Sequence, residues 1–295
     1  MIERWIKNDL TRKRWRRFKA RRSAVASLWL LVGLCFFSFS AEWWANSRPL
    51  VLRFRGETYF PVARDYPAHV FGQTEAMIPD YRALELADED WALWPLIKWD
   101  PYESNKEVVT FPAPPSGDNW MGTDDRGRDI FTRLLYGLRY SVAYAVLVWL
   151  ITFTVGTLAG GIMGWRGGRV DFWGQRVVEV LSTVPQFFLL IIIIAIFKPS
   201  LPLLIFISCL FGWISISYYV RGEFLQNRKK DFVEGARAVG ASGGRIFFRH
   251  LLPNSLGPVI TFSPFVISAN IVGLASLDYL GFGLTPPTPS WGELL

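Results

Sequence analysis

The sequence predicts an all-α integral membrane protein that carries a small extracytoplasmic subdomain of short strands and loops. Hydrophobic residues make up 51% of the 295 residues, and the 14 tryptophans are typical of proteins with aromatic belts at the membrane interfaces. Five apolar stretches are each long enough to cross a bilayer as a helix. A long polar segment separates the first stretch from the other four, and this segment is the predicted subdomain.

The net charge of +7 is distributed in a way that indicates membrane topology. Residues 1–22 carry ten Lys and Arg against two acids, whereas residues 46–135 carry ten against fifteen Asp and Glu. A nucleic-acid footprint would need a basic motif, and none accompanies this charge. Both cysteines lie in apolar runs and only two histidines are present, which excludes a disulfide framework and histidine-based metal or triad chemistry.

The first 45 residues are predicted to be a basic cytoplasmic tail, 1–22, and an uncleaved first span, 23–45. The tail orients the span by the positive-inside rule and contacts lipid. Residues 46–135 form the extracytoplasmic subdomain, with a β-hairpin over Val51–Phe54 and 59–62 that turns at Gly56. We expect the rest of the subdomain to be irregular and held together by aromatic packing. It either caps the membrane domain or receives a soluble partner.

The membrane core is predicted over residues 136–295. Thr123 or Asp124 caps an amphipathic helix that leads into the second span, about 140–163. Gly156, Gly160 and Gly164 form a ladder of small residues in this span, and it packs either within the chain or against a partner subunit.

Three further spans follow in the core. A short basic turn over 165–176 precedes the third span, about 177–197, which Pro185 can kink. The fourth span covers about 201–220 and the fifth about 256–277. Asn270 in the fifth span and Asp278 at its outer end are candidate pathway residues, because polar groups inside membrane spans are often functional.

Residues 221–255 form the predicted cytoplasmic loop between the fourth and fifth spans. Its apolar positions predict one helix with the stripe Phe232, Val233, Ala236 and Val239. Gly240 ends this helix as a residue with a left-handed backbone would. A second short helix carries a basic face made by Arg245, Arg249 and His250. The loop therefore predicts a helix-turn-helix that meets a soluble partner.

This loop resembles the EAA loop of the permeases of bacterial ABC importers, whose pattern is Glu-Ala-Ala, three residues, Gly, nine residues, Ile-x-Leu-Pro. The chain matches that pattern at Glu234, Ala236, Gly240, Leu252 and Pro253, and it differs at Gly235 and His250. The segments 122–129, 249–254 and 286–292 are similar to the dipeptide/oligopeptide subfamily, so the resemblance covers about residues 119–295. The acidic outer segment and residues 276–283 are most similar to the second permease of Yej-type peptide importers, which also admit microcin C.

The resemblance implies a type I ABC-importer permease in the bacterial inner membrane that has no ATPase site or cofactor of its own. Its implied partners are a second unlike permease, two ATP-binding domains that use ATP and Mg, and an extracytoplasmic peptide-binding protein. The span count gives a separate expectation: a chain with an inside N-terminus that stops at Leu295 on the outer side predicts that a C-terminal segment with a sixth span is missing from this sequence. ATP-driven closure would move the loop, and the residues implied in this coupling are Glu234, Ala236, Arg237, Gly240, Arg245, Arg249, His250, Leu252 and Pro253.

Three alternatives stay open at the level of sequence. The same architecture could import a non-peptide substrate such as a nickel chelate, and Leu274, where related permeases often carry an acid, weakens any transfer of substrate contacts. The loop could merely orient the spans. An intramembrane enzyme would need paired Ser/Lys, Asp/Asp or His/Glu groups within the spans, and the predicted spans hold none. The chain also lacks a G-x-x-x-x-G-K-[ST] phosphate loop.

Overall fold

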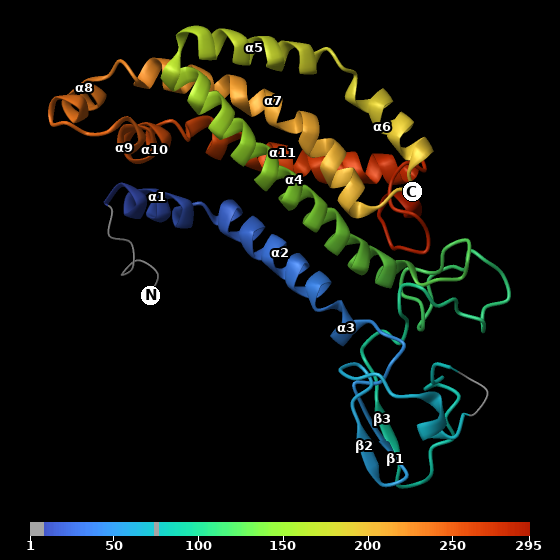
Figure 1. Cartoon of the computed structure of the whole chain (residues 1–295). Helices are drawn as coiled ribbons and strands as arrows, with labels where there is room; N and C mark the ends of the chain where they lie inside the picture. The colour runs from blue at the N-terminus through green and yellow to red at the C-terminus, as the bar shows by residue number, and fades with distance from the viewer. Residues whose placement is uncertain (1–8, 74–76) are drawn as a thin grey trace. The chain divides into compact units, whose positions relative to one another are not determined.

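The computed structural model of the protein describes residues 9–73 and 77–295. The chain forms two compact units, Met1–Arg139 and Tyr140–Leu295, and each is described by itself. Figure 1 shows the order of their helices and strands. The first unit holds the N-terminal helices and the subdomain, and the second holds most of the membrane core.

The first unit begins with three helices: α1 Asp9–Ala20, α2 Arg22–Phe39 and α3 Ala41–Trp44. The predicted tail 1–22 therefore contains a helix, and its first eight residues lie outside the described part. The predicted span 23–45 is interrupted at Ser40, whose hydroxyl accepts a hydrogen bond of 2.8 Å from the Trp44 indole. Most large apolar side chains of α2 are exposed, as expected for a helix that faces lipid.

The subdomain contains a three-stranded antiparallel sheet in the order β2-β1-β3, made by β1 Val51–Phe54, β2 Glu57–Tyr59 and β3 Trp91–Leu93. The predicted turn is present, with positive φ at both Arg55 and Gly56, which suits a two-residue hairpin. The predicted second strand, 59–62, begins two residues and ends three residues too late, and β3 replaces part of the expected irregular structure. A short 3-10 helix, η2 Ala68–Phe71, completes an aromatic core with the sheet.

A single helix of 37 residues, α4 Ile130–Arg166, joins the predicted amphipathic stretch to the second span. Its cap is neither Thr123 nor Asp124 but Asp129, whose carboxylate accepts a 2.7 Å hydrogen bond from the Thr132 backbone. Gly127 has a φ of +77°, which holds residues 124–127 in a turn and delays the start of the helix. Asp124 instead forms an ion pair of 2.8 Å with Arg128.

The predicted turn over 165–176 is wrong, because helix α5 Gly168–Ser182 occupies most of it. The chain reverses within two residues at Gly167 and Gly168, where φ is +64° and +55°. Helix α6 Gln186–Ile196 follows, and the α5–α6 pair is bent by 65° at the break that contains Pro185. The third span was predicted with this kink.

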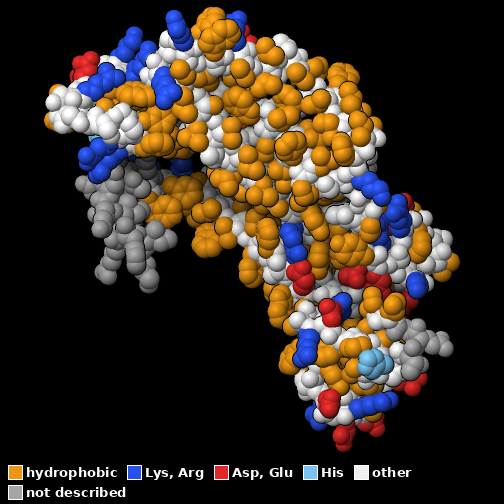
Figure 2. Space-filling model, viewed as in Figure 1, with side chains coloured by type: hydrophobic (Ala, Val, Ile, Leu, Met, Phe, Trp, Pro, Cys, Tyr) orange, Lys and Arg blue, Asp and Glu red, His pale blue; other side chains and the backbone are white. Residues whose placement is uncertain are grey.

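Two long helices complete the core: α7 Leu201–Asn227 and α11 Gly257–Tyr279. Among the described residues, α2, α4, α7 and α11 are each long and apolar enough to cross a membrane, and the bent α5–α6 pair could count as a fifth span. Figure 2 shows hydrophobic side chains over the visible face of the helical unit, with Lys and Arg gathered where α8 lies. A last 3-10 turn, η4 Gly292–Leu294, packs on the end of α11.

The glycine ladder of α4 packs within the chain. A Cβ on Gly156 would lie 2.5 Å from the Trp213 carbonyl oxygen, and one on Gly160 would lie 2.3 Å from the Ser217 carbonyl oxygen. Trp213 and Ser217 belong to α7, and Gly164 approaches Arg221 of α7 in the same way. Of the two readings that the sequence left open, the structure supports contact between α4 and α7 of one chain, because only glycine permits this backbone approach.

Candidate functional site

The 221–255 loop is the first candidate site, and it has the predicted helix-turn-helix form. Helix α8 Asp231–Ala238 is followed by a turn and by the short helices α9 Gly243–Arg245, η3 Ile246–Leu251 and α10 Leu252–Asn254. Gly240 has a φ of +79°. The Gly240 amide donates to the Arg237 carbonyl and the Ala241 amide to the Ala236 carbonyl, which is the Schellman pattern at a helix end.

One face of the loop is buried against the two long helices α4 and α7. Val233 and Leu251 are fully buried, and Ile246 and Phe247 are nearly so. They share one hydrophobic cluster with Phe153 of α4 and with residues of α7, namely Ile216, Val220 and Phe224. Because protein cores are close-packed, a force on the loop is transmitted to these helices rather than absorbed locally.

Polar contacts tie the loop to the same helices. The buried Asn227 side chain at the end of α7 donates a 2.9 Å hydrogen bond to the hydroxyl of Ser255, which closes the loop at its base. Arg228 donates to the Gly164 carbonyl at 3.1 Å near the C-terminal end of α4, where the helix dipole also favours a cation. The Arg237 guanidinium lies 5.3 Å from the ring centre of Trp165.

Helices α5 and α7 are joined by an ion pair at the same end of the bundle. The Arg221 guanidinium makes two hydrogen bonds to the Asp171 carboxylate, one of them 2.6 Å long. Such a bidentate pair fixes both groups in one geometry. The loop therefore sits on a base in which α4, α5 and α7 are connected.

A π-helical turn, η3 Ile246–Leu251, was not predicted. Pro253 has no backbone N–H, and its ring clashes with the carbonyl four residues earlier in a regular α-helix. The wider turn accommodates the missing donor, and after it the Ser255 amide donates to the Leu251 carbonyl at 3.0 Å, which is the ordinary α-helical spacing. The Leu252 and Pro253 end of the predicted motif thus has a distinct backbone form.

The opposite face of the loop points away from the bundle. Val239 and Phe248 are 84% and 61% exposed, although Val239 belongs to the predicted apolar stripe. Phe232 is also exposed, so only Val233 and Ala236 of that predicted stripe are buried. The loop also carries exposed charged side chains, namely Glu234, Arg245 and Arg249, and Arg237 is exposed as well but contacts Trp165 of α4.

A pocket of about 480 Å³ lies between α4, α6, α7 and α11 and is the second candidate site. Its wall is mainly apolar, with polar groups from Tyr144, Gln186, Ser208 and Asn270. The hydroxyls of Tyr144 and Ser208 lie 2.6 Å apart, and the Asn270 side chain donates to the Ala145 carbonyl at 3.3 Å. Asn270 was predicted as a pathway residue. The other three were missed, although a polar residue inside an apolar span is a signal that could have found them.

Asp278, the other predicted pathway residue, does not line this pocket. The residue is 9% exposed, and its carboxylate accepts a 2.6 Å hydrogen bond from the Leu284 amide. A Cβ on Gly283 or Gly292 would collide with Asp278, which shows how closely the last residues wrap around it. Asp278 therefore anchors the segment after α11.

The two sites are linked through shared helices. The outer face of the loop has apolar and charged side chains that a partner could contact. Its inner face packs against α4 and α7, which border the pocket. No group of three or more metal-ligating side chains is present in the part of the chain that the structure describes.

Comparisons with known proteins agree with this geometry. Residues 156–295 match the family described as binding-protein-dependent transport system inner membrane component. Residues 10–66 match the N-terminal transmembrane domain of oligopeptide transport permease C. The first match includes the whole 221–255 loop and the second covers α2 and the β1–β2 hairpin.

Curated relatives extend the match to nearly the full chain. The chain is 40% identical over 293 residues to the inner membrane ABC transporter permease protein YejE of Escherichia coli (strain K12), covering 98% of this chain and 86% of that protein. It is 37% identical over 315 residues to the peptidoglycan transport system permease protein YejE of Agrobacterium fabrum, covering 97% and 82%. It is also 37% identical over 181 residues to the dipeptide transport system permease protein DppC of Bacillus subtilis, covering 61% and 57%.

Proposed function

Because this chain belongs to the binding-protein-dependent inner membrane components of ABC transporters, we propose that it is one of two permeases of an ATP-driven importer of short peptides. It is a multi-pass protein of the bacterial inner membrane, and its N-terminus lies in the cytoplasm in this proposal. ATP and Mg are bound and used by two partner domains, separate or fused, and this chain contributes no cofactor.

The observation that carries the proposal is the two-faced 221–255 loop. Its inner face is locked to α4 and α7 by Phe247 and Leu251, and its outer face exposes Val239 and Phe248 among charges. An exposed aromatic group ringed by charges is typical of an interaction site. Movement of an ATP-binding domain docked on the outer face would therefore tilt α4 and α7 as a unit.

In this mechanism the pocket between α4, α6, α7 and α11 is this chain's half of the pathway. Tilting of α4 and α7 changes the pocket that they line, which is how alternating access is achieved by rigid movement of packed helices. Tyr144, Ser208 and Asn270 supply hydroxyl and amide groups for the backbone of a passing peptide. A second, unlike permease supplies the facing half.

The substrate class rests on the relatives, which are named as dipeptide, oligopeptide and peptidoglycan permeases. We therefore place short peptides first and include peptides linked to sugars or to nucleotides, as in microcin C, among the substrates to assay. An extracytoplasmic peptide-binding protein delivers them.

The test is uptake by the reconstituted complex. Proteoliposomes that contain this chain, its partner permease, the ATP-binding domains and the binding protein should accumulate radiolabelled tri-alanine only when ATP can be hydrolysed. A non-hydrolysable ATP analogue is the control. Accumulation of a nickel chelate without uptake of any peptide would contradict the proposal and favour the alternative substrate.

A further inference from the structure

The extracytoplasmic subdomain contains a groove that the proposed mechanism does not use. Its volume is about 450 Å³, within the range of pockets that bind small ligands. Six residues define what we term the tryptophan groove. Trp99 forms its floor and Trp94 and Trp120 its walls, and Lys98, Glu107 and Asp118 lie around them.

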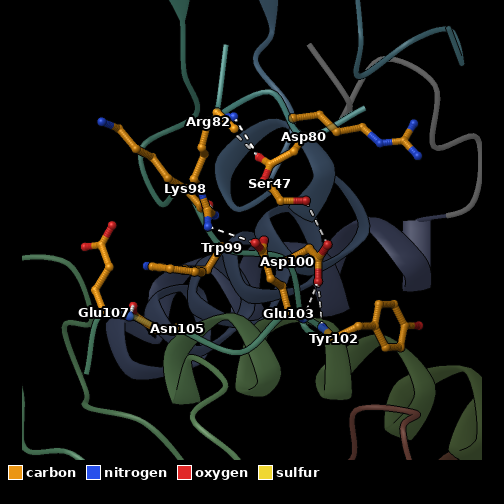
Figure 3. Close-up of polar contacts among 12 residues, drawn as sticks. Ser47, Asp80, Arg82, Lys98, Trp99, Asp100, Tyr102, Glu103, Asn105 and Glu107 are labelled. Carbon is orange, nitrogen blue, oxygen red and sulfur yellow. Dashed lines mark hydrogen bonds and ion pairs between the residues drawn. The ribbon is translucent and has the colours of Figure 1, made fainter. Parts of the chain in front are cut away.

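The floor of the tryptophan groove is fixed. Trp99 is buried, and its indole N–H donates a 3.1 Å hydrogen bond to the Asp118 carbonyl. The Arg82 guanidinium stacks 3.8 Å from the Trp99 ring centre and forms an ion pair of 2.9 Å with Glu103 (Figure 3). Burial raises the pKa of Glu103, and Arg82 opposes this rise by its charge. Arg82 therefore already has its ionic and aromatic partners within the floor of the groove.

The charges around the tryptophan groove have no partner of opposite charge, although the Lys98 ammonium lies 5.9 Å from the ring centre of Trp94. The side chains of Lys98, Glu107 and Asp118 are exposed, and none makes an ion pair or a side-chain hydrogen bond with residues 9–73 or 77–295. Figure 3 shows Lys98 and Glu107 extending to the same side of Trp99. One ammonium and two carboxylates thus line one aromatic hollow without pairing with one another.

We propose that the tryptophan groove binds short peptides through their free termini. Lys98 binds the α-carboxylate, Glu107 and Asp118 bind the α-ammonium group, and Trp94 and Trp120 pack on an apolar side chain. Groups of both signs around an apolar wall are complementary to a zwitterion with an apolar body. Anionic lipid headgroups suit the groove less, because two of its three unpaired charges are negative.

This inference rests on the proposed function for the class of substrate and adds a place where the permease itself contacts that substrate outside the membrane. The groove lies wholly within the first unit. It would hold a peptide near the membrane surface after release from the delivering protein. Weak binding suits such a transfer site, since the peptide has to leave again.

The experiment measures binding to the full chain in lipid nanodiscs by fluorine NMR. The probe is the tripeptide alanyl-4-fluorophenylalanyl-alanine with free termini, compared with its N-acetylated, C-amidated and doubly capped forms. We expect each single cap to raise the Kd about tenfold, because it removes one charge-assisted contact.

Variants assign the contacts. Lys98→Ala should remove the preference for a free C-terminus, and Glu107→Gln with Asp118→Asn should remove the preference for a free N-terminus. Trp120→Ala should weaken binding of all four probes. All four positions are exposed, so these variants should fold.

Matched controls lie outside the tryptophan groove on exposed positions of the same subdomain: Lys106→Ala, Asp88→Asn with Glu89→Gln, and Trp91→Ala. These should leave every Kd unchanged. Equal affinity for free and capped peptides, or equal losses in groove and control variants, overturns the proposal. A groove variant that lowers only stimulation of ATP hydrolysis by the binding protein also overturns it, and indicates a protein docking surface.

Failure of this inference is distinct from failure of the proposed function. Uptake of tri-alanine by the complex, without charge-dependent binding to the groove, overturns the groove alone. Binding of free peptides without any ATP-dependent peptide uptake overturns the proposed function and leaves the groove as a peptide site.

Discussion

At the scale of single residues, glycines of α4 determine how closely α4 and α7 approach. A methyl group on Gly160 would lie 2.3 Å from a backbone carbonyl oxygen of α7, and backbone cannot move aside as a flexible side chain can. Gly222 of α7, in contrast, has open space around it. The two glycines therefore provide a matched pair.

We expect Gly160→Ala to lower the unfolding temperature of the purified chain and Gly222→Ala to leave it unchanged or raise it slightly. Overpacking costs about 1–3 kcal/mol, whereas the gain in helix propensity is about 1 kcal/mol. Thermal unfolding in detergent measures the difference. Equal unfolding temperatures for both variants would mean that α4 and α7 are not held in this contact.

Gly240 is a second residue whose backbone conformation leads to a testable prediction. Its left-handed backbone costs other residues about 1–2 kcal/mol, which lowers the population of the native turn roughly five- to thirtyfold. We expect Gly240→Ala to reduce peptide uptake per ATP hydrolysed while the complex still assembles. Gly235→Ala, inside helix α8 with open space, restores the family residue and should not reduce this ratio. Unchanged coupling in both variants would contradict the role of the turn.

At the scale of elements, η3 places a buried and an exposed phenylalanine at adjacent positions. Phe247 is 6% exposed and packs 5.1 Å from Phe224 of α7, measured between ring centres, whereas Phe248 is 61% exposed. The two phenylalanines therefore have different surroundings, because they lie on different faces of the loop.

We expect Phe247→Ala to destabilise the chain by about 3–5 kcal/mol, because it leaves a cavity in the loop cluster. Phe248→Ala should change stability by less than about 0.5 kcal/mol but weaken association with the ATP-binding domains at least about fivefold. Thermal unfolding and an affinity titration with the isolated ATP-binding domains separate the two effects. Unchanged affinity of the Phe248→Ala variant would show that the outer face of the loop is not part of the interface.

At the scale of the whole molecule, the membrane topology that we predict from charge and parity has a direct test. With Cys35 and Cys209 replaced by serine, single cysteines at Lys13, Glu89 and Arg245 report on α1, the subdomain and the loop, where all three positions are exposed. We expect a membrane-impermeant maleimide to label only the cysteine at position 89 in intact spheroplasts. Labelling at positions 13 and 245 instead would show that the orientation is the opposite of the predicted one.

Much of the molecule is encoded in local pattern. The five apolar stretches, the hairpin turn at Gly56, the bend near Pro185 and the end of α8 at Gly240 each depend on a few neighbouring residues. The spacing from Glu234 to Pro253 identified the family, and the curated relatives support it. Local rules suffice in these places because hydropathy, proline and glycine act through the backbone near them.

Other features were decided by contacts between distant residues. Strand β3 forms because it pairs with β1, about forty residues away, and three residues have no pattern of their own. Asp129 rather than Thr123 caps α4, because positive φ at Gly127 holds the preceding turn. The basic segment 165–176 is helical because its polar side chains meet α7, as the Asp171 and Arg221 pair shows.

The sequence by itself therefore determined that the protein is a membrane permease with a helix-turn-helix between its last two spans, since span length and motif spacing are properties of the chain alone. Only the tertiary structure decided that the glycine ladder faces α7, that Val239 and Phe248 point outward, that Asp278 is an anchor and that three tryptophans enclose a charged groove. Each of these depends on which surfaces meet, and the free energy of such contacts is set by burial and packing that no local pattern specifies.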